Sequence, residues 1–336
     1  MDTHNQHIKI LVTGGAGFIG HHFVEHLLKN TDWEILILDR LNYASNGLER
    51  LRNIRVFDEK RIFVFTADFT KPIEEGLQQE IGEVDYIVHM GAETHVDNSI
   101  LDPRKFVYAN VVGTLEVLEF ARRQKNLKKI IYFSTDEVFG PAPEGVEYKE
   151  WDRYNSKNPY AATKAGGEEL CLAYANTYQL PVIITHTMNV FGERQHPEKF
   201  IPKIIRLVLA DEPVTIHANK DKTKAGSRFW IHARNVAAAM IFLLNNQTKQ
   251  GDKYNIVGEK EVDNLTMAKQ IAQILGKELH YEMVDFHSSR PGHDLRYALD
   301  GQKMKSLGWE IPMSFENSLT KTVQWTLNNP RWLHLP

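Results

Sequence analysis

Cysteine, long apolar runs and clusters of positive charge are all scarce in this sequence. The longest apolar run, residues 236–244, is too short to cross a bilayer. The polar N-terminal residues lack the apolar core of a signal peptide. A net charge of −3 without a block of lysine or arginine argues against binding to nucleic acid or to an anionic membrane surface. We therefore expect a cytoplasmic protein with neither kind of partner.

The single cysteine, Cys171, lies among apolar residues of an expected helix. One cysteine cannot form an intrachain disulfide, and this position favours a buried thiol over a nucleophile. The 15 histidines show no paired helical spacing beside acids or thiols. We therefore predict no metal site and a reducing compartment.

Short apolar runs rich in β-branched residues alternate with helical patterns along the first half of the chain. This alternation is typical of a parallel sheet with helices on both faces. Beyond residue 190, proline, glycine and charged residues become more frequent. Strands are predicted at 8–12, 35–38, 62–65, 86–89, 130–133, 182–185 and 254–257, and long helices at 103–124 and 159–178.

Three glycines, Gly14, Gly17 and Gly20, follow the first predicted strand and lead into a helix that begins with Phe18 and Ile19. Glycines let the backbone turn tightly and approach a pyrophosphate, whose charge the helix N-terminus stabilises. The spacing is Gly-x-x-Gly-x-x-Gly rather than Gly-x-Gly-x-x-Gly, and alone it is a weak signal. The preceding strand and the following helix make it a dinucleotide-binding loop.

An acidic residue, Asp39, ends the second predicted strand, 19 residues beyond Gly20. A carboxylate there accepts hydrogen bonds from a ribose diol and repels a 2′-phosphate, so NAD is favoured over NADP. Arg40 weakens this preference because a cation accommodates that phosphate. The alternative is a solvated turn pair. Asp68 and Phe69, after the third strand, are expected to border the adenine, although Asp68 could equally be a turn acid.

These features predict an α/β fold, a Rossmann-type doubly wound parallel sheet with a smaller, discontinuous α/β substrate-binding domain. We assign residues 1–187 to the NAD-binding domain, with 229–257 returning to it. The smaller domain takes residues 188–228 and 258–336.

Tyr160 and Lys164 lie one turn apart on the second long helix. An ammonium group can lower the pKa of the phenol and hold the nicotinamide ribose, so that the tyrosinate accepts a hydroxyl proton. Thr135, Asp136 and Glu137 follow the fifth strand. A reaction that breaks a C–H and a C–O bond needs such a second acid and base, whereas the competing interpretation is a helix-capping loop.

The chain resembles the extended short-chain dehydrogenase/reductase superfamily and, within it, the nucleotide-sugar 4,6-dehydratases of the dTDP-glucose type. Thr135-Asp136-Glu137 separates these dehydratases from the related epimerases, whose corresponding positions usually lack both acids. The resemblance runs from about residue 8 to the end of the chain. It rests on the motifs at 13–20, 39–44, 89–97, 110–114, 134–140, 160–164, 197–202 and 290–297.

The resemblance implies a cycle in which tightly bound NAD is not consumed. Tyr160 takes the O4 proton while hydride leaves C4, with Thr135 beside O4 and Lys164 supporting the tyrosine. Glu137 then removes the C5 proton and a protonated Asp136 gives its proton to the departing C6 hydroxyl. Hydride returns to C6 and a proton to C5, which leaves a 4-keto-6-deoxy sugar and water.

The resemblance also implies contacts with the ligands and a likeness in assembly. Ala92 joins the cofactor-binding residues, and the relatives' homodimers suggest that 103–124 and 159–178 pair across a two-fold axis, although both could belong to the core. Residues 93–97 could line the sugar or nicotinamide pocket or form a packed loop. The expected substrate-binding residues are His95, Asn189, Lys199, Arg228, Asn264, Arg290 and His293.

Departures from the dTDP-glucose pattern leave the substrate open. This chain has residues 186–193 where the relatives typically read Arg-Cys-Ser-Asn-Asn-Tyr-Gly-Pro, and Asn98 replaces an arginine. dTDP, UDP and GDP sugars, or an N-acetylated sugar, therefore remain candidates. Two other functions compete: a 4-epimerase, which needs Tyr160 and Lys164 but not the two acids, and a non-catalytic NAD-binding sensor or scaffold.

Overall fold

The computed structural model describes residues 8–42, 45–285 and 295–333. Contacts within the chain divide it into two compact units. Unit 1 comprises Met1–Ser134, Pro159–Thr185 and Met240–Tyr254, and unit 2 comprises Thr135–Asn158, His186–Ala239 and Asn255–Pro336. Unit 2 thus includes residues 135–158 and 229–239, which the predicted boundaries gave to the NAD-binding domain. The division of function between two domains stays a prediction.

A seven-stranded sheet forms the centre of the α/β fold, in the order β11-β6-β5-β4-β1-β2-β3. β1 pairs in parallel with β2 and β4, and β2–β3 and β4–β5 are also parallel pairs. This order confirms the predicted Rossmann-type sheet, and it places the point where the strand order reverses between β1 and β4. The strands are β1 Lys9–Thr13, β2 Glu34–Asp39, β3 Ile62–Thr66, β4 Tyr86–His89, β5 Lys129–Thr135, β6 Val182–Thr187 and β11 Lys253–Ile256.

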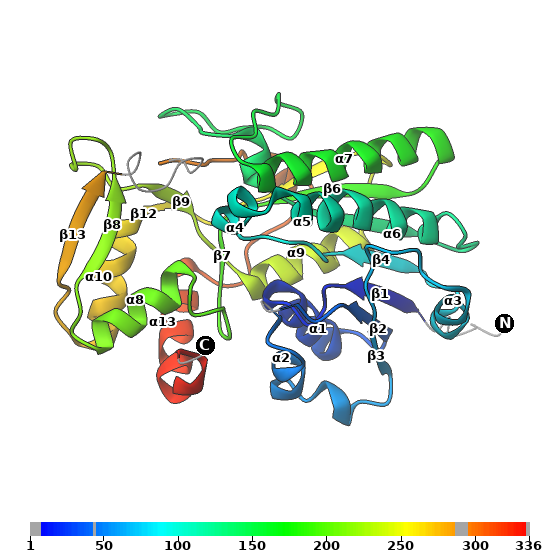
Figure 1. The fold of residues 1–336 in the computed structure, drawn as a ribbon, viewed down its shortest axis with the longest axis horizontal. Coiled ribbons are helices and arrows are strands. Elements are labelled where there is room, and N and C mark those ends of the chain that lie inside the picture. The colour runs from blue at the N-terminus through cyan, green and yellow to red at the C-terminus, as the bar shows by residue number, and fades with distance from the viewer. Residues whose placement is uncertain (1–7, 43–44, 286–294, 334–336) are drawn as a thin grey trace. The chain divides into compact units, whose positions relative to one another are not determined.

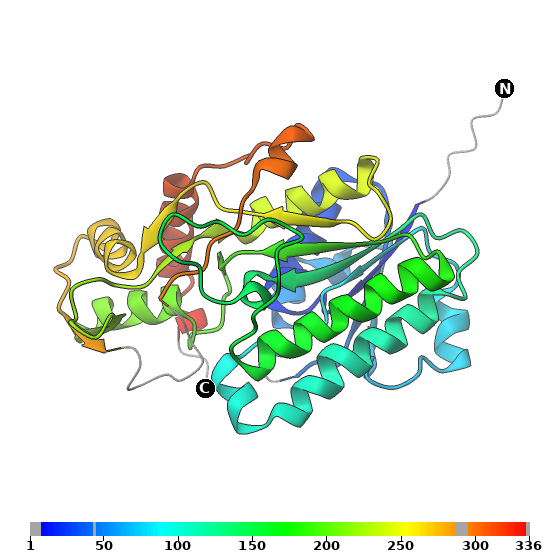
Figure 2. The ribbon, with the colours of Figure 1, turned by 90° about the horizontal axis from the view of Figure 1, so that it is seen from above.

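Helices cover both faces of this sheet. α6 and α7 lie side by side on one face and α1 lies on the other (Figures 1 and 2). Cys171 lies on α7 and is buried in the core, as predicted. The helices are α1 Phe18–Asn30, α2 Glu49–Asn53, α3 Glu75–Ile81, α4 Val96–Leu101, α5 Pro103–Val107, α6 Gly113–Ala121, α7 Pro159–Tyr178 and α9 Ala233–Asn245, with a short 3-10 turn η2 at Val56–Asp58.

The predicted helix at 103–124 is not a single α-helix. A π-helical turn, η3 Tyr108–Val112, separates α5 from α6, and α6 ends at Ala121. Pro103 occupies the first turn of α5, where its missing N–H costs nothing. The extra residue in the π-turn changes which side chains face α7, and Asn110 is one of them.

Unit 2 packs three helices, α8 Phe200–Leu209, α10 Asn264–Leu275 and α13 Phe315–Asn328, around an apolar core of its own. Three two-stranded sheets accompany them: β10-β7, β12-β9 and β13-β8. The remaining elements are η4 Asp136–Phe139, β7 Val190–Phe191, β8 Val214–Ala218, β9 Ser227–Phe229, β10 Ile231–His232, β12 Glu261–Asp263, β13 Tyr281–Asp285, α12 Gln302–Ser306 and η5 Pro330–Leu333.

The described residues contain neither a membrane-spanning helix nor a metal-binding cluster. None of the helices there is long and apolar enough to cross a membrane. Likewise, in residues 8–42, 45–285 and 295–333, no group of three or more His, Cys, Asp or Glu side chains is arranged to hold a metal ion.

Candidate active site

The turn between β1 and α1 can be built only with glycine at two positions. Gly14 has a φ of +72°, and a Cβ there would lie 2.7 Å from the backbone nitrogen of Gly91. A Cβ on Gly20 would lie 2.1 Å from the carbonyl oxygen of Gly14. Gly17 precedes α1 and provides no side-chain cap, so the first N–H groups of the helix suit a phosphate group. This backbone cradle fits the pyrophosphate of NAD.

Asp39 ends β2 beside this turn and is only 6% exposed. Its Oδ2 accepts a hydrogen bond from the Ala16 N–H at 3.0 Å, and its Oδ1 accepts one from the Leu41 N–H at 2.8 Å. Burial raises the pKa of Asp39, while these two hydrogen bonds oppose the rise. Asp39 and Arg40 are therefore not a solvated turn pair, because Arg40 forms an ion pair with the buried Glu93.

The other residues expected near the cofactor differ in their surroundings. Asp68 is exposed and accepts hydrogen bonds from the N–H and hydroxyl of Thr70 at 3.0 and 2.8 Å, which is a turn arrangement. Phe69 is buried, and a Cβ on Gly91 would lie 2.6 Å from its ring. Ala92, which follows Gly91, is half-buried. Their contacts with the adenine stay a prediction.

A buried histidine ties together the ends of β1 and β4. His89 Nδ1 lies 2.6 Å from the Thr13 hydroxyl, and its Nε2 lies 3.1 Å from the Thr114 hydroxyl. Burial lowers the pKa of His89 to about 3, so the ring is neutral. Thr13 also accepts the Gly91 N–H at 3.1 Å. This network fixes the close approach of the two strand ends under the glycine loop, and sequence reasoning missed it.

Tyr160 and Lys164 both lie in α7 and are buried. The backbone N–H of Tyr160 donates to the Ser99 hydroxyl at 3.1 Å, and its ring packs edge-on against Phe106. The Lys164 ammonium donates to the Phe133 carbonyl at 2.7 Å and lies 4.1 Å from the centre of the Tyr132 ring. Burial lowers the pKa of Lys164 to about 8. The ammonium group can therefore release a proton at a pH only slightly above neutral.

In unit 2, Thr135 closes β5 and caps the 3-10 turn η4 that carries the two acids. Its hydroxyl donates to Asp136 Oδ1 at 3.0 Å and accepts the Glu137 N–H at 3.4 Å. The capping interpretation of this motif is therefore correct locally, but it does not account for the acids. Glu137 Oε2 accepts a hydrogen bond from the Asn158 amide at 3.0 Å.

Asp136 is the most unusual side chain of this turn. It is 5% exposed, and its Oδ2 is a buried oxygen with no hydrogen-bond partner among the described residues. Burial, and then the neighbouring Glu137, raise the pKa of Asp136 to about 7, while Arg228 opposes the rise. Near neutral pH, Asp136 can therefore hold a proton on an oxygen that no other group in the described part of the chain engages.

Comparison with known proteins settles the family. The sequence model of the NAD-dependent epimerase/dehydratase family matches residues 10–257. This chain belongs to that family. The resemblance inferred from the motifs is thus confirmed.

Relatives of this family member include dehydratases and epimerases. A dTDP-glucose 4,6-dehydratase of Salmonella typhimurium is 37% identical over 350 residues, covering 97% of this chain and 95% of that protein. The dTDP-glucose 4,6-dehydratase of Streptomyces venezuelae, solved with NAD bound, is 34% identical with a TM-score of 0.87, covering 97% of this chain and 99% of that one. A UDP-glucuronic acid 4-epimerase of Bacillus cereus is 26% identical with a TM-score of 0.85. The match covers 96% of this chain and 100% of the epimerase chain.

Four of the residues expected to bind substrate lie in unit 2, as do Thr135, Asp136 and Glu137. Arg228, on β9, donates to the carbonyls of Ser227 and Leu295 at 2.6 and 2.7 Å and lies 4.6 Å from the centre of the Tyr297 ring. The others are Asn189 before β7, Lys199 before α8 and Asn264 at the start of α10.

The remaining substrate residues are placed otherwise. His95 belongs to unit 1, where its Nδ1 accepts the Asn98 N–H at 3.3 Å and caps α4. Arg290 and His293 lie outside the described residues. The glycine loop, Asp39, Tyr160 and Lys164 belong to unit 1 together with His95.

Asn158 is a site residue that sequence reasoning missed. It is buried, holds Glu137, and stands two residues before Tyr160 in the sequence. The available signal was an asparagine directly before Pro159, where the residue is restricted to extended conformations.

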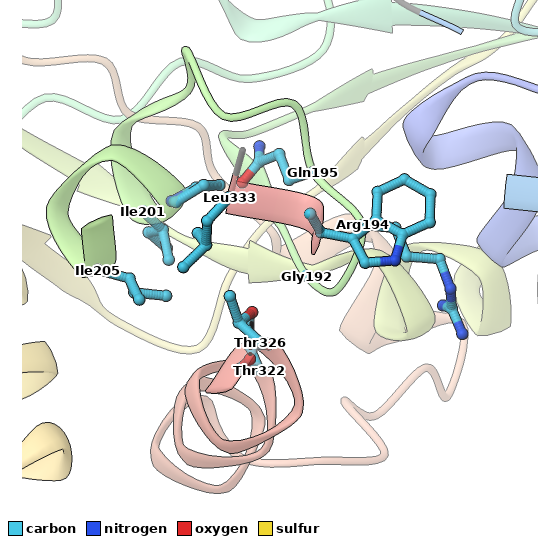
Figure 3. Close-up of a pocket in the computed structure, with 10 residues that line it drawn as sticks. Gly192, Arg194, Gln195, Ile201, Ile205, Thr322, Thr326 and Leu333 are labelled. Atoms are coloured by element: carbon cyan, nitrogen blue, oxygen red, sulfur yellow. Dashed lines mark hydrogen bonds between the residues drawn. The ribbon is translucent and has the colours of Figure 1, made fainter. Parts of the chain in front are cut away.

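A small cavity in unit 2 is not the substrate site. It lies between α8 and α13 (Figure 3) and has a volume of about 10 Å³, room for about one water molecule. Residues that line it include Ile201, Ile205, Thr322 and Thr326. None of the predicted site residues borders it.

Proposed function

We propose that this protein is an NAD-dependent nucleotide-sugar 4,6-dehydratase, a hydro-lyase that converts an NDP-hexose into the NDP-4-keto-6-deoxyhexose and water. The observation that carries this proposal is the pair of adjacent acids after β5. Asp136 is buried with a pKa of about 7 and an unengaged oxygen, whereas Glu137 is half-buried and held by Asn158. Elimination of water requires one such acid and one such base.

The first half-reaction belongs to α7. NAD, which the glycine loop and Asp39 would hold, would supply a reversible carrier for the hydride that leaves C4 and returns to C6. Tyr160 accepts the O4 proton, and Lys164, fixed by the Phe133 carbonyl, supports the phenolate with its charge. Thr135 holds O4 in place.

The second half-reaction belongs to the turn after β5. A ketone at C4 acidifies the C5–H bond, so Glu137 can remove that proton. Asp136 then donates its proton to the departing C6 hydroxyl, which leaves as water. Because its Oδ2 has no partner among the described residues, Asp136 can make this donation without first breaking a hydrogen bond.

We infer that dTDP-glucose is the first substrate to test, because the relatives at 35–37% identity over nearly their full length include several dTDP-glucose 4,6-dehydratases. Arg228 binds the diphosphate, since a guanidinium fork matches phosphate oxygens. Asn189, Lys199 and Asn264 complete the binding of the nucleotide sugar.

The decisive experiment compares Glu137→Gln with the wild type in D2O. The variant keeps its shape and still oxidises C4, because that step uses Tyr160, but it loses exchange at C5 and loses elimination. Rapid mixing with dTDP-, UDP- and GDP-glucose, followed by nicotinamide absorbance and product mass, measures both steps. We expect reduced cofactor and the 4-keto hexose to accumulate.

Asp136→Asn is the matched variant, because it retains the base and removes only the proton donor. It should permit deuterium incorporation at C5 and stop before water is lost. If Glu137→Gln still eliminates water at the wild-type rate, the proposal fails. A wild-type product of unchanged mass would instead indicate a 4-epimerase.

We further propose that the protein acts in the cytoplasm as a homodimer. Exposed apolar side chains of α4, α5 and the adjoining π-turn include Leu101 (83%), Val107 (45%) and Tyr108 (61%). Such a patch is typical of a contact with a second chain. Light scattering during size-exclusion chromatography should give twice the mass of one chain. The Leu101→Asp variant should give the mass of a single chain.

A further inference from the structure

Arg40 directly follows the carboxylate expected to bind the adenosine ribose, which is the place where a cation would favour NADP. An arginine near this ribose is a recognised way to accommodate a 2′-phosphate. The sequence alone therefore gives opposing signals, with Asp39 favouring NAD and Arg40 favouring NADP. The structure shows what Arg40 does instead.

The guanidinium of Arg40 is held by Glu93, which lies in the loop after β4 and is 3% exposed. The same carboxylate oxygen accepts the Asn42 amide at 3.1 Å and lies 3.5 Å from the Lys105 ammonium. The Arg40 guanidinium also lies 5.8 Å from the centre of the Phe69 ring. Two segments of unit 1, one with Arg40 and Asn42 and the other with Lys105, thus converge on one buried carboxylate.

The position of Glu93 is itself fixed by its backbone rather than by its side chain. Its N–H donates to Asn110 Oδ1 at 2.8 Å, and its carbonyl accepts from Asn110 Nδ2 at 3.0 Å. Asn110 stands in the π-helical turn and also donates to the Thr163 hydroxyl at 3.0 Å. The side chain of Glu93 is therefore not needed to build the loop, so its carboxylate is available for another purpose.

We propose that Glu93 is a cofactor-specificity residue: by pairing with Arg40 it withholds the guanidinium from the adenosine ribose and so keeps the site selective for NAD over NADP. Asp39 repels the 2′-phosphate directly, and Glu93 removes the cation that would offset that repulsion. The two carboxylates act on the same discrimination, Asp39 from the end of β2 and Glu93 from the loop after β4. This inference depends on the cofactor site alone and not on the proposed dehydration.

The test is a competition for the binding site in the full-length protein. Protein is equilibrated with equal concentrations of NAD and NADP until the bound ratio is constant, then desalted, and the bound dinucleotides are separated and quantified. Glu93→Gln should shift the bound ratio toward NADP by about tenfold or more, the scale of one charge-assisted hydrogen bond to the phosphate. Circular dichroism confirms that the variant is folded.

Three matched variants separate this role from simple support of the loop. Lys105→Gln removes the other cation but leaves the Arg40–Glu93 pair, so the ratio should not change. Adding Arg40→Gln to Glu93→Gln should cancel the gain for NADP. Arg40→Gln alone should leave the ratio within about twofold of the wild type, because a withheld guanidinium contributes nothing to NADP binding.

Two results would overturn the proposal. One is a Glu93→Gln protein that binds both dinucleotides at the wild-type ratio, or loses both in parallel, as a merely structural residue would. The other is a tenfold loss of NADP on Arg40→Gln alone, which would mean that Arg40 already reaches the phosphate. This second measurement is informative even if Glu93→Gln does not fold.

Discussion

At the scale of single residues, the burial of Asp136 lowers the free energy of unfolding of the protein at neutral pH. A carboxyl buried beside Glu137 ionises only near pH 7, whereas the same group in the unfolded chain ionises near its ordinary value. Folding is therefore opposed at neutral pH, because the unfolded chain releases a proton that the folded chain retains. Such a cost is typical of catalytic groups.

We predict that Asp136→Asn inactivates the enzyme and stabilises the fold. Below pH 3.8, the ordinary pKa of this carboxyl, ionisation of Asp136 should contribute little to the difference in the free energy of unfolding between variant and wild type. As pH rises from there to about 7 the wild type loses stability progressively, and above about 7 the difference becomes constant. At pH 8 the gain should be on the order of a few kcal/mol. Urea unfolding at pH 4, 6 and 8 measures it, and a pH-independent difference would contradict the assigned cause.

Tyr160 has a separate and earlier role. Tyr160→Phe should slow the first hydride transfer by roughly two to four orders of magnitude, because the O4 proton loses its acceptor. Single-turnover absorbance of the nicotinamide measures this step alone. Its ring contact with Phe106 is preserved in the variant, so the melting temperature serves as the control. Reduced cofactor forming at close to the wild-type rate would exclude Tyr160.

The sequence was sufficient to nominate these side chains but not to describe their states. The residue types and their spacing identified Thr135, Asp136, Glu137, Tyr160 and Lys164 as a group. Burial raises the pKa of Asp136, and Arg228, a residue 92 positions away in the sequence, opposes the rise. The contact of Asn158 with Glu137 and the withdrawal of Arg40 by Glu93 are likewise tertiary, so local patterns could not reveal them.

At the scale of elements, regular structure followed from the pattern, whereas interruptions did not. α7 has the predicted bounds, 159–178, because Pro159 starts it and its buried residues recur at helical spacing as far as Ala175. The π-turn at Tyr108–Val112 lies inside a sequence that remains amphipathic. The π-turn is stabilised by hydrogen bonds that Asn110 makes with Glu93 and Thr163. Both partners are distant from Asn110 in the sequence.

The C-terminal end of α9 is capped by a lysine side chain. The Lys129 ammonium donates to the carbonyls of Leu243 and Leu244 at 2.6 and 3.3 Å, and to that of Asn246 at 2.7 Å, at the end of α9. Lys129→Met should destabilise the fold by about 1 to 3 kcal/mol, because buried carbonyls lose their donor. Chemical denaturation measures the change.

The neighbouring lysine provides the control for that measurement. Lys128 lies 2.9 Å from Asp85 but is exposed, so Lys128→Met should cost less than about 1 kcal/mol. Equal losses in the two variants would show that the carbonyl contacts of Lys129 contribute no more than an ordinary surface charge.

At the scale of the whole molecule, the predicted fold class is confirmed, whereas the division of function between two domains stays a prediction. The compact units cut β5 after Ser134 and α9 after Ala239, whereas a reading of the sequence naturally places boundaries between elements. A strand or helix that is continuous in hydrogen bonding can nevertheless pack against two cores. Composition along the chain carries no signal for that.

The complete cycle returns the cofactor to its starting state, which gives a prediction for the whole protein. Purified protein should carry NAD and turn over without added dinucleotide, and reduced cofactor should not accumulate during steady turnover. Chromatography of denatured protein measures the occupancy, and Asp39→Ala should lower it. A stoichiometric rise in reduced cofactor with product would rule out the proposed internal return of hydride.

The burial of Cys171 has a practical consequence for following this molecule in solution. Burial on the core side of α7 raises the pKa of its thiol, so thiol-reactive dyes and spin labels should leave the native protein unmodified. The wild-type chain is therefore already a silent background for site-directed labelling, without the cysteine removals that such work usually begins with. A cysteine placed at the exposed Leu101 would be the sole reactive position, and its signal would report on that surface alone.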